Sequence, residues 1–240
     1  MTFFYKNAIN VFTDASVINL KDNNQNVQVT CSGFITVKDG FVEQNGLKIT
    51  HNATNSYGEI YAIKMGVENL LSHSDSDRFL NIFSDSKVSI LGLRLWMESW
   101  HQNSKNKILF NSSNSPVFNQ EIFLEIVRLI VQYNVHISFY HIPGHMRPNN
   151  INDMKNFKEI FLKNFQSNSY FENQLANVPD DILVELCNFN NVIDNMTRDY
   201  LHEIVYSDNY NPNDYKRYSI YPFYWFPKKE DIENYKKLVL

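Results

Sequence analysis

Cysteine is scarce in this chain of 240 residues, which contains only Cys31 and Cys187. Two cysteines in separate regions predict neither a disulfide framework nor a zinc site. The sequence also lacks an apolar run long enough to span a bilayer, and its first ten residues lack the basic segment and apolar core of a signal peptide. We therefore expect no membrane partner and a reducing, cytoplasmic setting.

An excess of positive charge is also absent. The 22 Lys and Arg residues are outnumbered by 26 Asp and Glu residues, which gives a net charge of −4 and argues against a broad electrostatic grip on nucleic acid. The balance is uneven, because residues 1–164 hold 15 basic and 14 acidic residues whereas residues 165–240 hold 7 and 12. If nucleic acid binds, we expect the first part to bind it through a local contact.

Two apolar segments each end in an acid that is followed by small residues. Residues 10–16 read Asn-Val-Phe-Thr-Asp-Ala-Ser, and residues 79–86 read Phe-Leu-Asn-Ile-Phe-Ser-Asp-Ser. A run of β-forming residues closed by turn-prone residues predicts a strand. Asp14 and Asp85 are therefore predicted at strand ends, where a side chain faces a cleft rather than the core.

Two more acids lie where helical patterns begin. Glu59 opens an apolar helical run, and Asp153 follows a Gly-His loop at the start of another. If the two strands are neighbours, all four acids can converge on one point. Converging carboxylates repel each other unless cations are present, and hard oxygen ligands of this kind suit Mg²⁺ or Mn²⁺.

Hydrophobic periodicity predicts an α/β domain over residues 1–165. Strands are predicted at residues 8–14, 29–37, 41–49, 79–84 and 135–140, and helices at residues 59–71, 86–100, 119–133 and 153–165. Residues 17–28 are predicted as a polar loop. Three antiparallel strands joined by hairpins, followed by alternating helices and strands, predict a mixed five-stranded sheet flanked by helices.

The last third predicts a separate, mainly α-helical domain over residues 166–240. Helices are predicted at residues 181–189, 191–206 and 228–240, and an aromatic stretch at residues 218–227. This segment is interpreted either as a small cap that packs its aromatic side chains or as a surface for a protein partner or single-stranded nucleic acid. Its net negative charge disfavours the nucleic acid.

Four motifs in residues 1–164 resemble those of the type-1 ribonuclease H family. Residues 11–16 resemble its first-strand acid motif, residues 55–60 its helix-opening Asn-x-x-x-Glu-Leu, and residues 82–86 its fourth-strand Thr-Asp-Ser. Residues 142–145, followed by Asp153, resemble its Gly-His loop and final acid. All four motifs occur in order, each on the expected element, and they imply a ribonuclease H-like fold with a small C-terminal extension.

This resemblance implies a two-metal site. The four residues that would hold the ions are Asp14, Glu59, Asp85 and Asp153. They would bind two Mg²⁺ ions about 4 Å apart, with Mn²⁺ as a substitute, so that one ion activates a water and the other stabilises the leaving 3′ oxygen of a phosphodiester.

The resemblance also implies roles for residues around the metals. His145 would shuttle protons or help the product to leave, since a histidine titrates near neutral pH. Ser16, Asn55 and Lys87 would contact the substrate. Asn55 would touch the ribose 2′-hydroxyl, which is the group that distinguishes RNA from DNA.

The resulting hypothesis is a Mg²⁺-dependent endonuclease that hydrolyses the RNA strand of RNA–DNA hybrids. The sequence departs from the family in the polar segment 17–28, in the short loop between His145 and Asp153, and in a basic protrusion reduced to Lys105 and Lys107. Two alternatives therefore stay open. In the first alternative, the chain is another nuclease on the same fold that acts on structured DNA, single strands or plain RNA. In the second, it is a non-catalytic module that binds nucleic acid or protein.

Overall fold

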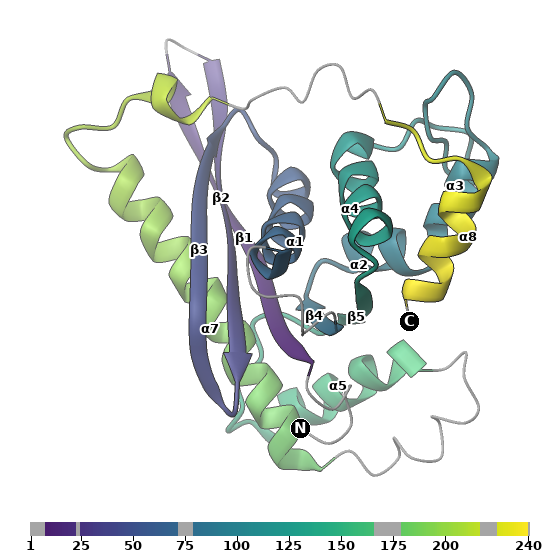
Figure 1. The fold of residues 1–240 in the computed structure, drawn as a ribbon. Coiled ribbons are helices and arrows are strands. Elements are labelled where there is room, and N and C mark those ends of the chain that lie inside the picture. The colour runs from purple at the N-terminus through teal and green to yellow at the C-terminus, as the bar shows by residue number, and fades with distance from the viewer. Residues whose placement is uncertain (1–7, 23–24, 72–78, 166–178, 217–224, 240) are drawn as a thin grey trace.

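A five-stranded sheet forms the centre of the molecule. The computed structural model describes residues 8–22, 25–71, 79–165, 179–216 and 225–239. The strands are β1 (Ile9–Asp22), β2 (Gln25–Lys38), β3 (Phe41–His51), β4 (Phe79–Ser84) and β5 (His136–His141), in the spatial order β3-β2-β1-β4-β5 (Figure 1). The first three strands pair antiparallel, whereas β1 with β4 and β4 with β5 pair parallel, which confirms the predicted mixed sheet.

The first hairpin is longer than predicted, and the polar loop predicted at residues 17–28 is wrong. β1 and β2 continue to pair as far as Asp22 and Gln25. Ile18 and Leu20 lie on one side of β1, where they pack against a buried cluster shared with the C-terminal part of the chain. Alternate residues of a strand point to the same face, and apolar side chains on that face become buried only when another element covers it. For the second half of β1, the covering element is a helix far away in the sequence.

Helices cover both faces of the sheet (Figure 1). They are α1 (Asn55–Leu71), α2 (Lys87–Leu91), the π-helical turn η1 (Gly92–Trp96), α3 (Met97–Gln102), α4 (Gln120–Tyr133), α5 (Ile151–Leu162), the 3-10 turn η2 (Lys163–Phe165), α7 (Asp180–Val205), the 3-10 turn η3 (Pro212–Tyr215) and α8 (Lys229–Leu238). The prediction of two separate helices at residues 181–189 and 191–206 is wrong, because α7 runs through this region as one helix of 26 residues.

Alternation along the strands divides the core into two layers. Val11 and Ile82 belong to the cluster shared with α1, α4 and α8, whereas Phe12 and Phe83 belong to the cluster shared with α5 and α7. The rings of Phe12 and Phe83 stack with their centroids 4.8 Å apart. Successive side chains of a strand point to opposite faces, so each strand contributes to both layers.

The C-terminal helices share these layers. Helix α7 packs along β1 and β2, and its Leu186 and Ile193 belong to the layer of the core that contains Phe12 and Phe83. Helix α8 packs on α4, and its Tyr235 hydroxyl donates a hydrogen bond of 2.6 Å to the carbonyl oxygen of Leu93. The division into domains at residue 165 stays a prediction, and the described part of residues 166–240 is built into the core of the first part.

The aromatic stretch predicted at residues 218–227 lies mostly outside the described residues. Trp225 and Phe226 are described, and both pack against the layer of the core that contains Val11 and Ile82. Among the described helices, none combines the length and the apolar character needed to cross a membrane.

Candidate metal centre

The parallel register of β1 and β4 brings two acids together. Thr13 pairs with Ser84 in the last step of the ladder, so Asp14 and Asp85 are the next residues on neighbouring strands. Carboxyl ends of parallel strands open onto the same edge of a sheet, which is where ligands bind in α/β folds. Asp85 directly follows β4, as predicted, whereas Asp14 lies within β1, which continues to Asp22. The two acids are neighbours because the parallel ladder between β1 and β4 ends just before them.

Helix α1 adds a third acid from the side of the sheet. A Cβ atom at Gly58 would overlap the side chain of Thr30 and come within 2.8 Å of the Ala15 Cβ, so glycine permits the helix to approach β1 and β2 closely. The next residue, Glu59, is consequently buried, with 6% of its surface exposed. Asn55 Nδ2 donates a hydrogen bond of 3.2 Å to Glu59 Oε1.

These three acids form a tight group in which Asp14 and Glu59 are buried and Asp85 is half-buried. One carboxylate oxygen from each of Asp14, Glu59 and Asp85 lies within 4.8 Å of the other two. Burial, followed by the charge of Asp85, raises the pKa of Asp14 to about 7. Burial also raises the pKa of Glu59, to which the charges of Asp14 and Asp85 add, and burial raises the pKa of Asp85. Burial is thus the main cause of all three shifts, and repulsion between the acids adds to the shifts of Asp14 and Glu59.

The donor set fits a divalent cation. Glu59 Oε2 is buried and has no hydrogen-bond partner among the described residues, although a buried carboxylate oxygen normally has one. A divalent ion would bind this oxygen, and its positive charge would favour the ionised form of all three buried or half-buried acids. Oxygen-only ligands select Mg²⁺ or Mn²⁺ over softer metals.

An open cleft of about 620 Å³ surrounds this group. Seven of the eight residues predicted for the site line it, namely Asp14, Ser16, Asn55, Glu59, Asp85, Lys87 and His145. The side chain of His145 is 77% exposed, and its backbone has a φ of 56°. A Cβ atom at Gly144 would overlap Asp85 Oδ2, so glycine lets the His145 loop lie directly against this acid.

Asp153 is the predicted residue that the structure does not bring into the cleft. Its carboxylate accepts hydrogen bonds from Arg147 Nε at 2.9 Å and from the Arg147 backbone nitrogen at 3.0 Å. These bonds hold the pKa of Asp153 below its ordinary value. Asn150 caps helix α5 by accepting from the backbone nitrogens of Asn152 and Asp153. The expected convergence of four acids is therefore met by three of them.

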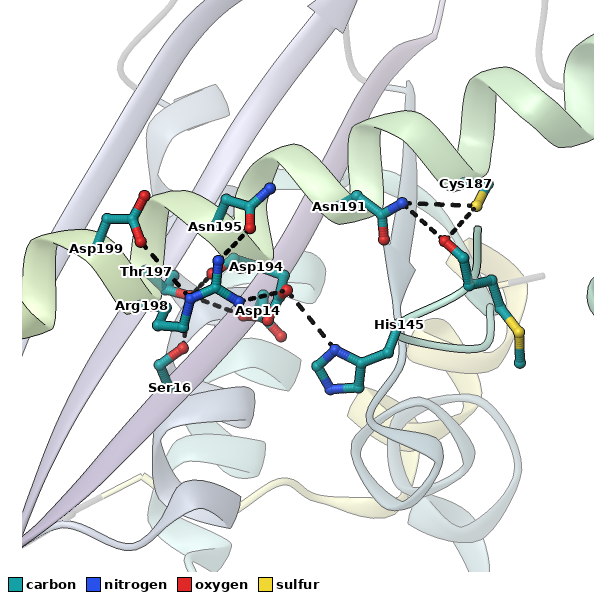
Figure 2. Close-up of polar contacts among 11 residues, drawn as sticks. Asp14, Ser16, His145, Cys187, Asn191, Asp194, Asn195, Thr197, Arg198 and Asp199 are labelled. Carbon is teal, nitrogen blue, oxygen red and sulfur yellow. Dashed lines mark hydrogen bonds and ion pairs between the residues drawn. The ribbon is translucent and has the colours of Figure 1, made fainter. Parts of the chain in front are cut away.

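Sequence reasoning missed a set of residues from α7 on the opposite side of the cleft. Asp194, Arg198 and His202 line it at intervals of four residues, which places them on one helix face. Thr197 Oγ1 donates a hydrogen bond of 2.8 Å to Asp14 Oδ2, and it lies 3.0 Å from Ser16 Oγ (Figure 2). The polar spacing was the available signal, but a predicted break near residue 190 concealed the helix.

Comparisons with known proteins identify the family of this chain. The RNase H family model matches residues 6–156, which include the three clustered acids and end before α7. Two curated relatives, the ribonuclease H of Tropheryma whipplei strain Twist and that of strain TW08/27, are each 36% identical over 87 residues, covering 36% of this chain and 50% of the relative. The chain thus spans about half the length of the curated relatives it matches.

Solved structures of similar fold include two ribonuclease H proteins. The solution structure of the PFV RNase H domain has a TM-score of 0.47 and 18% identity, covering 68% of this chain and 94% of that domain. The crystal structure of LC11-RNase H1 in complex with an RNA/DNA hybrid has a TM-score of 0.41 and 16% identity, covering 65% of this chain and 97% of that one.

Proposed function

Because this chain belongs to the RNase H family, we propose that it is a metal-dependent endonuclease that hydrolyses the RNA strand of RNA–DNA hybrids. The observation that carries the proposal is the convergence of Asp14, Glu59 and Asp85 within 4.8 Å, with a buried Glu59 oxygen that has no partner in the part of the chain that the structure describes. A structural role alone gives no reason to bury Asp14 and Glu59 beside a third acid.

The three acids would hold divalent cations, for which we propose Mg²⁺ with Mn²⁺ as a substitute. Two such ions, when bound, supply an activated water and stabilise the charge on a leaving 3′ oxygen. The protein positions their ligands beforehand. Asn55 fixes one oxygen of Glu59 by its 3.2 Å hydrogen bond, and the Thr197 hydroxyl fixes one oxygen of Asp14. Such supporting hydrogen bonds orient metal-binding side chains.

Other residues of the cleft are suited to the substrate. Asn55 and Ser16 offer an amide and a hydroxyl, which can hydrogen-bond a ribose 2′-hydroxyl. Lys87 is exposed at the cleft and offers a positive charge to a backbone phosphate. His145 lies on an exposed loop beside Asp85, where an imidazole can accept and release protons in exchange with solvent.

Hydrolysis of a panel of substrates tests the proposal. We expect the chain to cleave the RNA strand of an RNA–DNA hybrid in Mg²⁺ or Mn²⁺, and to leave duplex RNA, duplex DNA, single strands and branched DNA largely intact. Asp14→Asn and Asp85→Asn should each lower hydrolysis on the order of 100-fold or more, because metal ions supply several kcal/mol of transition-state stabilisation. Circular dichroism would establish that the variants are folded.

Asp208→Asn provides a matched control, because Asp208 is exposed and does not line the cleft. This variant should keep the wild-type rate. Equal rates for the wild type and Asp14→Asn would reject a catalytic role for the acids and would favour a binding module. Preferential cleavage of DNA or of plain RNA would retain the nuclease and change its substrate.

A further inference from the structure

One carboxylate at the cleft lies outside the region that matches the family. Asp194 belongs to α7, beyond residues 6–156, yet it lines the same cleft as the three clustered acids. Its negative charge contributes to the raised pKa values of Asp14, Glu59 and Asp85. All three acids of the cluster therefore experience the charge of Asp194.

The placement of α7 beside the acids is specified by packing. Thr197 is fully buried and donates its hydrogen bond to Asp14. Gly33 pairs with Asp14 across the first hairpin, and a Cβ atom there would come within 2.6 Å of Thr197 Cγ2. The sheet thus leaves room for α7 at the position of the first acid.

A second contact ties α7 to the histidine loop. Asn191 Nδ2 donates a hydrogen bond of 2.9 Å to the carbonyl oxygen of Met146, the residue after His145 (Figure 2). Asp194, one helical turn further along, is 3.7 Å from His145 Nδ1. Asp194 is thus held on a helix that contacts both the loop and the sheet.

The two basic side chains near Asp194 make only weak contacts with its carboxylate. Arg198 Nη1 lies 3.5 Å from Asp194 Oδ2, and His145 Nδ1 lies 3.7 Å away. The side chains of Arg198 and His145 are 48% and 77% exposed, and exposed pairs at such distances contribute little free energy. Asp153, in contrast, receives two short hydrogen bonds from Arg147. Asp194 is therefore the more available ligand of the two.

We propose that Asp194 of α7, in place of Asp153, is the fourth carboxylate of the metal site. The unpartnered and buried Glu59 Oε2 in the same cleft is an independent sign that the site takes a cation. This inference rests on the proposed function, since it assigns a further ligand to the same ions. It would also make the C-terminal part of the chain a component of the active site.

Metal titration of four variants tests the assignment apart from activity. Mn²⁺ affinity would be measured by isothermal titration calorimetry, and metal-induced stabilisation by the rise in melting temperature. Asp194→Asn should lose at least about tenfold in Mn²⁺ affinity, since even residues that only support a ligand are worth 10- to 100-fold. Asp153→Asn should bind Mn²⁺ with wild-type affinity.

Asp199→Asn is the matched control on the same helix. Asp199 is 75% exposed, pairs with the same Arg198 at 3.6 Å, and does not line the cleft. It should bind Mn²⁺ as the wild type does, which would separate loss of a ligand from loss of an ion pair with Arg198. Melting in EDTA would show that Asp194→Asn is folded, and Asp194→Glu, which retains a carboxylate, should recover part of the affinity.

The outcomes distinguish this inference from the function on which it rests. Wild-type Mn²⁺ affinity in Asp194→Asn, or a comparable loss in Asp153→Asn, would overturn the assignment of Asp194 while leaving a metal-dependent nuclease intact. A wild-type chain that neither binds Mn²⁺ nor cleaves nucleic acid would overturn the proposed function and the assignment together.

Discussion

Asp14 combines burial with proximity to other acids, and this combination predicts a pH-dependent stability. Its pKa is about 7 in the folded chain, against an ordinary value near 3.9 for an unfolded one. Between these values the folded state binds more protons than the unfolded state, so the free energy of unfolding falls as pH rises. The raised pKa of Glu59 acts in the same direction.

We therefore expect the metal-free protein to melt at a lower temperature at pH 8 than at pH 5.5. Thermal unfolding in EDTA across this range would measure the difference, and Asp14→Asn should reduce it by removing one of the titrating groups. Mg²⁺ should raise the melting temperature more at pH 8, because ligands must be deprotonated to bind it. A melting temperature that rises with pH in EDTA would contradict the repulsion derived for this cluster.

At the scale of single residues, the sequence predicted those acids whose position follows from a local pattern. Asp85 directly follows β4, and Asp14 follows the last residue of β1 that pairs with β4, so the parallel pairing brings the two acids together. Asp153 has an equally good motif, but Arg147 lies close enough to bind its carboxylate. Asp194 could not be found this way, because its proximity to Asp14 depends on packing between segments 180 residues apart in the sequence.

At the scale of elements, the contact between β2 and α7 decides how the cleft is closed. Gly33 lies opposite Asp14, and its missing side chain makes space for Thr197 and Ile193. We expect Gly33→Val to displace α7 and to destabilise the protein by about 1–3 kcal/mol, the usual effect of overpacking a core. The hydrogen bond from Thr197 to Asp14 should weaken as the helix moves.

Urea denaturation would measure the loss of stability, and Mn²⁺ titration would measure the effect on the site. Glu43→Val is a suitable comparison, because Glu43 is exposed on the edge strand β3. This substitution introduces the same valine side chain into the same sheet. If Gly33→Val retained wild-type stability and wild-type Mn²⁺ affinity, α7 would not be positioned by this contact.

The packing of α7 on the sheet also explains which elements could be predicted from the sequence and which could not. Strands β4 and β5 are short and have both faces buried, so their apolar runs identify them locally. The second half of β1 was predicted as a loop because its polar residues are numerous, and its apolar positions acquire a partner only when Leu201 and Val205 of α7 cover them. Tertiary packing thus decided the length of the first hairpin.

At the scale of the whole molecule, α7 shares its core clusters with the sheet and helices of residues 1–165. Six large apolar side chains of α7 are buried against the sheet, namely Ile182, Leu183, Leu186, Ile193, Leu201 and Val205. Burial of a side chain of this size contributes about 1.5–3 kcal/mol, so the six together contribute about 9–18 kcal/mol as an upper estimate. The net stability of a typical protein is only about 5–15 kcal/mol.

A chain of residues 1–165 should therefore fail to fold cooperatively, although it contains every residue that matches the family. We expect it to lack a sharp thermal transition and to bind the dye ANS, which reports exposed apolar surface. Residues 166–240 supplied as a separate chain should restore the transition if the two parts dock through α7. A truncated chain that melts cooperatively near the temperature of the full-length protein would instead support two domains, and α7 would then be an addition to a complete fold.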